Sequence, residues 1–155
     1  MVALVLLPLP ALASQVDDRP DLRALSALNS LGSVVAVGVT LSEYSHYVLE
    51  AKIAVDRELA SWNGSADSKN EAWAAMELYI IAKNAWAADV SRSLSPMPSG
   101  LHTLCPLRGE IMRRSVAERP ESEMSFGVIG KKDLQILWAC ARERTRRVES
   151  AIKEK

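Results

Sequence analysis

The clearest feature of the chain is an apolar residue at every third or fourth position between residues 41 and 62. The positions that make this face are Tyr44, Val48, Ala51, Val55, Leu59 and Trp62. Such a period places them on one side of an α-helix. Thr40 and Glu43 precede the face with the spacing of a capping box, in which each side chain accepts a hydrogen bond from the other residue's backbone N–H. We therefore expect a helix over residues 41–62, with Asn63–Gly64 ending it in the left-handed conformation.

Two further segments show one apolar face each. Between residues 20 and 37, leucines recur at intervals of three behind Pro20, a residue that suits the first turn of a helix. The β-branched stretch 33–39 could instead form a strand, but no partner strand is evident, so we favour a helix that ends near residue 37. Between residues 131 and 152 the spacing is again helical. Its face comprises Leu134, Trp138, Ala141, Thr145, Val148 and Ile152.

The remaining predicted helix, residues 69–94, is apolar around most of its circumference. A second capping box, Ser68 to Glu71, marks its start, and Pro96 limits its end. Its polar residues form one narrow stripe at every seventh position: Asn70, Glu77, Asn84 and Ser91. A helix of this kind is expected at the centre of a fold, in contact with several neighbours. The tryptophans all fall on predicted helices, in or beside the expected core: Trp62, Trp73, Trp86 and Trp138.

Residues 96–130 break the helical pattern repeatedly. Prolines at 96, 98, 106 and 120 and glycines at 100, 109, 127 and 130 interrupt it, and only residues 107–118 could form a short helix. The fold class we expect is therefore all-α. It is a three- or four-helix antiparallel bundle with a long irregular connection before the last helix.

The first thirteen residues resemble a secretory signal peptide. They contain no charge and end in the small-x-small sequence Ala11-Leu12-Ala13, after which the chain turns polar. Pro8 and Pro10 argue against an ordinary buried helix there, which is the alternative. Because a basic N-terminal region is missing, we interpret residues 1–13 as a signal peptide truncated at its N-terminus. Residues 14–155 then form a single helical domain that is periplasmic or secreted.

Composition and charge narrow the function classes. Of 155 residues, 48% are hydrophobic and 25% charged, which is ordinary for one globular domain. Nineteen Lys and Arg balance nineteen Asp and Glu, so the net charge is zero. A neutral chain lacks the positive field that attracts nucleic acid or an anionic membrane, and no apolar run is long enough to span a bilayer.

The two cysteines are expected to form a disulfide. Cys105 lies in the irregular connection and Cys140 on the last predicted helix. In an exported protein such a bond would tie the connection to the bundle. The alternative is two reduced thiols, with Cys140 packed as a small core residue.

Arginines supply the densest charged feature. Arg142 and Arg146 on the last helix, with Arg113 and Arg114 in the connection, form a possible anion or partner site. Against this, glutamates lie four positions before arginine or lysine on the same helix, at Glu143–Arg147 and Glu149–Lys153. These are favourable intrahelical pairs, so a solvated, partly paired face is the simpler interpretation.

The remaining candidate groups do not form a recognisable metal or haem site. His102 and Cys105 share a loop, but zinc needs more ligands than these, and His46 is expected to be solvated. A haem would have only His46 or His102 as its first ligand and a methionine as its second. The candidate methionines are Met76, Met97, Met112 and Met124. We expect no cofactor.

The sequence thus favours a non-catalytic exported binding module whose partner is a protein or a component of the cell envelope. The alternative from another class is a small exported helical enzyme that combines the arginines with Glu50, Glu77 or Glu110. A haem- or metal-binding bundle is the third. A closed pocket where Arg and Glu converge would favour the enzyme, and a solid core with an exposed apolar groove would favour the binding module. The sequence leaves the oligomeric state open.

Overall fold

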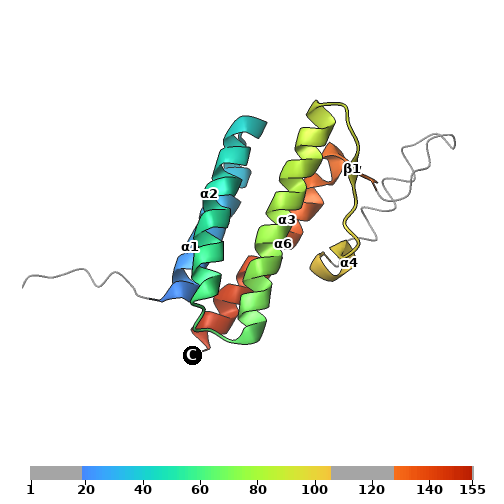
Figure 1. Cartoon of the computed structure of the whole chain (residues 1–155). Helices are drawn as coiled ribbons and strands as arrows, with labels where there is room; N and C mark the ends of the chain where they lie inside the picture. The colour runs from blue at the N-terminus through green and yellow to red at the C-terminus, as the bar shows by residue number, and fades with distance from the viewer. Residues whose placement is uncertain (1–18, 106–127, 155) are drawn as a thin grey trace, which may run out of the picture.

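In the computed structural model, which describes residues 19–105 and 128–154, four long helices form an antiparallel bundle (Figure 1). They are α1 (Pro20–Val37), α2 (Leu41–Ala60), α3 (Ala66–Val90) and α6 (Leu134–Lys153). The chain runs alternately up and down, so α1 and α3 point one way and α2 and α6 the other. Each helix packs on two neighbours around a square, in the order α1, α2, α3, α6. The expected all-α bundle is confirmed.

The start of α2 follows the sequence closely, but its end does not. The Thr40 hydroxyl accepts a hydrogen bond from the Glu43 N–H at 3.3 Å, and the Glu43 carboxylate accepts one from the Thr40 N–H at 2.8 Å. The predicted left-handed end at Asn63–Gly64 is wrong, because among the described residues only Gly38 and Arg92 have positive φ. Gly64 instead makes room for a neighbour, since a Cβ there would lie 2.5 Å from the Trp62 indole nitrogen.

The start of α3 corrects the predicted second capping box. Ser65, not Ser68, is the cap, and its hydroxyl accepts a hydrogen bond from the Ser68 N–H at 3.1 Å. Ser68 is buried inside the first turn. The helix ends at Val90 rather than residue 94, because Arg92 turns the backbone with φ of 54°. Two serines three residues apart offer the same capping chemistry, which is why the pattern alone chose the wrong one.

The connection before the last helix contains short ordered elements. Strand β1 (Ser95–Pro96) pairs antiparallel with β2 (Val128–Ile129), and α4 (Leu101–Leu104) lies between them in sequence. A 3₁₀ turn, η2 (Lys131–Asp133), delays the start of α6 to Leu134, three residues later than expected. The predicted short helix over residues 107–118 and the signal peptide over residues 1–13 lie outside the described residues.

Two interactions fasten this connection to the bundle. The predicted disulfide joins Cys105, at the end of α4, to Cys140 of α6, with 5.4 Å between their Cα atoms. Arg144 of α6 donates to the backbone carbonyls of Thr103 and Leu104 and to the Glu71 carboxylate of α3. Because carbonyls at a helix C-terminus lack intrahelical donors, Arg144 acts as a side-chain cap for α4.

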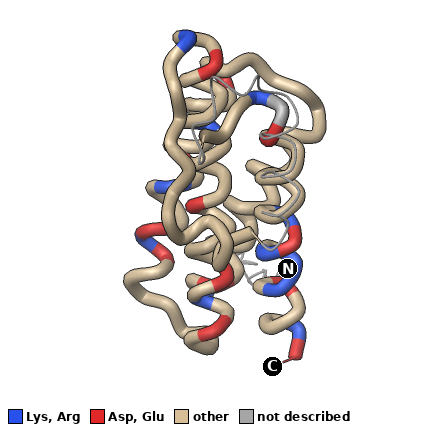
Figure 2. Tube along the Cα trace, turned by 90° about the vertical axis from the view of Figure 1, so that its right-hand side faces the viewer, with Lys and Arg blue, Asp and Glu red and all other residues tan. Residues whose placement is uncertain are grey.

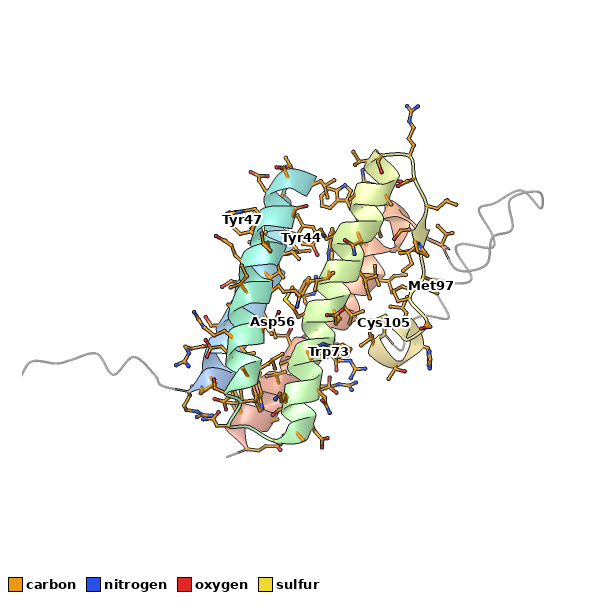
Figure 3. The ribbon with its side chains drawn as sticks, in the orientation of Figure 1. Tyr44, Tyr47, Asp56, Trp73, Met97 and Cys105 are labelled. Atoms are coloured by element: carbon orange, nitrogen blue, oxygen red, sulfur yellow. A yellow bond between two sulfur atoms is a disulfide. The ribbon has the colours of Figure 1, made fainter. Side chains whose placement is uncertain are left out.

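The core is aromatic at one end. The rings of Tyr44, Trp86 and Trp138 lie with their centroids 5.7–6.1 Å apart, and Figure 3 places Tyr44 on the side of α2 that faces α3. As expected for a central helix, α3 contributes buried residues on several sides. Trp73 is an exception to the expected burial of tryptophans, because it is 49% exposed on α3. None of the described helices is both long and apolar enough to span a bilayer.

Candidate functional site

A cavity of about 320 Å³ lies between α1 and α6, with the side chain of one α3 residue as its floor. It brings together two of the arginines that the sequence singled out, Arg142 and Arg146, one helical turn apart on α6. The residues that line it are Leu28, Asn29, Gly32, Ser33, Ala36, Tyr79, Arg142, Thr145, Arg146 and Glu149. Helix periodicity explains the α6 wall, since residues spaced by three and four share one face.

Gly32 opens the α1 wall. A Cβ built on it would lie 3.2 Å from the Tyr79 hydroxyl oxygen and 3.9 Å from Cγ of Arg142. The missing side chain therefore lets a phenol from α3 and an arginine stem from α6 meet against the α1 backbone. Glycine inside a helix lowers stability by about 1 kcal/mol relative to alanine, so this position has a packing reason that helix propensity alone does not reveal.

Tyr79 is the buried polar group at the floor of the cavity. It is 0% exposed, and its hydroxyl makes no hydrogen bond to any residue in the described part of the chain. Burial raises the pKa of Tyr79 to about 12, and the positive charge of Arg142 opposes that rise. A buried hydroxyl left without a partner costs roughly 1–3 kcal/mol, so its position at a cavity wall calls for an explanation.

Tyr44 shows how the same fold treats a tyrosine with a structural role. Its hydroxyl accepts a hydrogen bond from Nε1 of Trp138 at 2.9 Å and donates one to the backbone carbonyl of Tyr79 at 3.0 Å. Burial raises the pKa of this tyrosine as well. The bundle can therefore satisfy a buried phenol completely, as it does at Tyr44, whereas the Tyr79 hydroxyl has no partner among the described residues.

The charges on the α6 wall are unequally compensated. Arg142 forms neither an ion pair nor a hydrogen bond with another described residue, whereas Arg146 lies 3.6 Å from Glu143 and is 74% exposed. Glu149 pairs with Lys153 at 2.7 Å. That pair and the Glu143–Arg147 pair, at 3.5 Å, confirm the predicted intrahelical spacing. Of the two arginines on this wall, Arg142 is thus the one without an ion pair to a described residue.

The other arginines in the basic feature do not join the cavity. Arg144 and Arg147 turn to Glu71 of α3, at 2.7 and 3.7 Å. Arg113 and Arg114 lie outside the described residues. Positive and negative residues are interspersed along the helices, as expected for a neutral chain (Figure 2). The proposed four-arginine site is therefore represented here by Arg142 and Arg146, to which the structure adds Tyr79.

A second hollow, of about 340 Å³, lies between α1 and α2. Small and apolar side chains predominate among its lining residues, which are Ala27, Ser30, Leu31, Val34, Tyr47, Glu50, Ala51 and Ala54. Glu50, a candidate for the enzyme alternative, lies here and pairs with His46 at 3.3 Å. Glu77 lines neither this hollow nor the α1–α6 cavity, and Glu110 lies outside the described residues. The carboxylates expected of an enzyme are thus not gathered around the arginines.

The candidate metal and haem ligands are dispersed. His46 is exposed on α2, while His102 is on α4 with Nδ1 3.2 Å from the Ser99 carbonyl oxygen. Met76 is buried in the core and Met97 packs against it, whereas Met112 and Met124 lie outside the described residues. Over residues 19–105 and 128–154, no three His, Cys, Asp or Glu residues are grouped as metal ligands would be. Both cysteines are held in the disulfide.

No known protein family, curated protein or solved structure matches this chain. The α1–α6 cavity is therefore the feature of the molecule from which we infer a function. Sequence reasoning found Arg142 and Arg146 from charge density but missed Tyr79 and Gly32. Two weak signals pointed to them: a glycine in the middle of a predicted helix, and a tyrosine on a helix expected to be buried on several sides.

Proposed function

We propose that this protein is an exported, non-catalytic binding module that holds an anionic group of its partner in the α1–α6 cavity. One observation carries the proposal: the buried Tyr79 hydroxyl has no partner among the described residues and lies with Arg142 at the wall of a cavity. An anion would accept hydrogen bonds from both groups. The partner is a protein or a component of the cell envelope.

The chemistry of the lining residues supports binding rather than turnover. The two hydroxyls beside the arginines are used inside their own helices. Ser33 donates to the Asn29 carbonyl at 3.0 Å, and Thr145 donates to the Ala141 carbonyl at 3.0 Å. The carboxylate of the wall, Glu149, is paired with Lys153. A nucleophile within reach of a general base, which covalent catalysis requires, is not formed by these described residues.

Two features support export. The uncharged segment over residues 1–13 has the order of a signal peptide, and Cys105 and Cys140 form a disulfide. Structural disulfides persist in oxidising compartments and are rare in reducing ones. Intact mass of the natively expressed protein, measured before and after reduction and alkylation, tests this part. Retention of residues 1–13 together with two thiols that label without reduction would contradict export.

The binding function can be tested at the cavity itself. A photo-crosslinking amino acid is placed at position 36, since Ala36 lines the cavity on an exposed face. The protein is irradiated in native envelope extracts, with Arg142→Gln as the test variant. Arg147→Gln is the control, because Arg147 is on the same helix but does not line the cavity.

We expect a discrete adduct that Arg142→Gln abolishes and Arg147→Gln retains. An adduct that persists unchanged in Arg142→Gln would refute the role of the cavity, as would the absence of any adduct. Turnover of a substrate at this site, blocked by Glu149→Gln, would instead support the small helical enzyme.

A further inference from the structure

We infer that the α1–α6 cavity selects a monocarboxylate carried on a short apolar body, with the carboxylate between the Arg142 guanidinium and the Tyr79 hydroxyl. This inference rests on the proposed binding function and names the chemistry of the group that is bound. The number of donors fits. A carboxylate presents two oxygens, one or both of which the planar guanidinium can engage, and the phenol supplies one further O–H donor.

A dianion such as phosphate fits less well, because the lining donors other than Arg142, Tyr79 and the Asn29 amide are already engaged. The Ser33 and Thr145 hydroxyls donate to carbonyls of their own helices, and Arg146 lies 3.6 Å from Glu143. Gly32, Tyr79 and Arg142 lie well inside α1, α3 and α6, where backbone N–H groups are used by the helices themselves. None of the described helices has its N-terminus among the lining residues, where it would supply free amides. Glu149 adds a negative charge to the same wall, and Glu143 lies beside Arg146. A second negative charge would therefore lose its hydration without gaining enough new hydrogen bonds.

The rest of the lining favours an apolar body. Leu28 and the ring of Tyr79 are fully buried beneath the cavity, and Ala36 adds an exposed methyl group. A cavity of about 320 Å³ is at the small end of the range for small-molecule sites, about 300–1,000 Å³. The cavity itself therefore has room for a carboxylate and a short apolar body.

Access to the phenol depends on Arg142. The Tyr79 hydroxyl is buried where Gly32 and the stem of Arg142 come together. No hydrogen bond or ion pair within the described residues holds the Arg142 side chain in place, so none has to be broken when it moves. An incoming carboxylate can therefore draw the guanidinium toward itself and expose the phenol.

The same carboxylate chemistry has two sources, a free short acid or the carboxylate at the end of a polypeptide. Titration calorimetry on the mature, disulfide-bonded protein distinguishes them with hexanoate and N-acetyl-leucine as probes. Hexanol tests the need for charge, and inorganic phosphate tests the preference for a single charge. We expect at least one acid to bind, and hexanol and phosphate to bind about tenfold more weakly or not at all.

Three substitutions localise the binding. Tyr79→Phe and Arg142→Gln should each weaken the acid about tenfold, the effect of losing one hydrogen bond to a charged group. Gly32→Ala keeps both donors but places a methyl group 3.2 Å from the phenol oxygen, so it should also weaken binding while the helix remains folded. Tyr47→Phe and Arg147→Gln, which lie outside the cavity, should bind the acid as the wild type does.

The outcomes separate the ligand class from the binding function. Preferential binding of N-acetyl-leucine would support a polypeptide end as the source, and preferential binding of hexanoate a free acid. Phosphate binding more tightly than either acid, with dependence on Arg142, would overturn the carboxylate inference and leave an anion-binding site. If neither acid binds while the photo-adduct still requires Arg142, the ligand class is also wrong. If neither acid binds and no Arg142-dependent photo-adduct forms, the proposed function is wrong as well.

Discussion

Removing the hydroxyl of one buried tyrosine should stabilise this protein or leave its stability unchanged. The same change at a second buried tyrosine should destabilise it. The pair is Tyr79→Phe and Tyr44→Phe. Both side chains are fully buried in the same core, so the two substitutions delete the same atom from similar surroundings. They differ in hydrogen bonding. The Tyr79 hydroxyl bonds to no described residue, whereas the Tyr44 hydroxyl bonds to Trp138 and to the Tyr79 carbonyl.

The expected magnitudes follow from these contacts. Tyr44→Phe loses two hydrogen bonds, each with a net contribution of about 1 kcal/mol, and leaves the Trp138 N–H buried without an acceptor. We expect it to lower the free energy of unfolding by about 2–3 kcal/mol. Tyr79→Phe loses no protein hydrogen bond and removes a buried polar atom, so we expect a change between zero and a gain of about 1 kcal/mol.

Urea denaturation followed by tryptophan fluorescence and far-UV circular dichroism gives both values, with Tyr47→Phe as an exposed control. The dependence of the free energy on urea should be the same in all variants, because the surface exposed on unfolding does not change. A loss of more than about 1 kcal/mol in Tyr79→Phe would refute the reasoning. It would mean that the hydroxyl has a strong partner in solution and is not held ready for a ligand.

Alkaline pH gives an independent measure of the same group. The folded pKa of Tyr79 is raised to about 12 from an ordinary value of 10.0, because burial penalises the phenolate. A raised pKa favours the protonated, folded form, so its contribution to stability is complete below pH 10 and is lost as the pH rises through 12. Between pH 10 and 12, the free energy of unfolding of Tyr79→Phe should therefore fall less steeply with pH than that of the wild type. Equal slopes would show that the phenol ionises as easily in the folded as in the unfolded chain.

Three further perturbations test how the bundle is held. The pKa of Glu58 is lowered by hydrogen bonds from two arginines, so its contribution to stability is present above pH 4.5 and lost as the pH falls through the depressed value. In Glu58→Gln, the free energy of unfolding should therefore fall less at acid pH than in the wild type, as measured by urea denaturation at a series of pH values. Replacing Cys105 and Cys140 together by serine should cost about 3–4 kcal/mol, measured against the oxidised wild type. Arg144→Met should cost about 2–4 kcal/mol, since Glu71 and the α4 carbonyls lose their main donor. The double variant Arg144→Met/Glu71→Gln should recover part of this loss, and a double-mutant cycle measures how much.

The parts of the fold that sequence predicts best are those where one local interaction decides the outcome. The start of α2 is an example, because Thr40 and Glu43 satisfy each other's backbone N–H groups and their side chains also hydrogen-bond to each other. The start of α3 was placed three residues too late because Ser65 and Ser68 both cap well, and burial of Ser68 in the packed bundle decides between them. In such a case local chemistry identifies the residues that could cap the helix, and tertiary contacts determine which of them does.

The candidate site lies at the limit of what sequence predicts. Charge density singles out Arg142 and Arg146 on α6, although intrahelical pairing is the simpler interpretation of their helix face. Intrahelical ion pairs form at Arg147, with Glu143, and at Lys153, with Glu149. Arg142 has no ion-pair partner in the described part of the chain. Tyr79 joins the site from α3, 63 positions earlier than Arg142 in the sequence. Only the packing of α3 between its neighbours brings the two together.

Three features that packing of the bundle does not require meet at one place. Gly32 lies inside a continuous helix, and the Tyr79 hydroxyl is buried without a partner among the described residues. Arg142 forms no ion pair with a described residue, on a helix where its neighbours do. Any one of them alone would be an ordinary imperfection. Their coincidence at the wall of a cavity is harder to explain by packing, because the same core satisfies Tyr44 completely. Local rules are expected to fail together where a protein keeps a site for another molecule, and a bound acid would satisfy the phenol and the arginine at once.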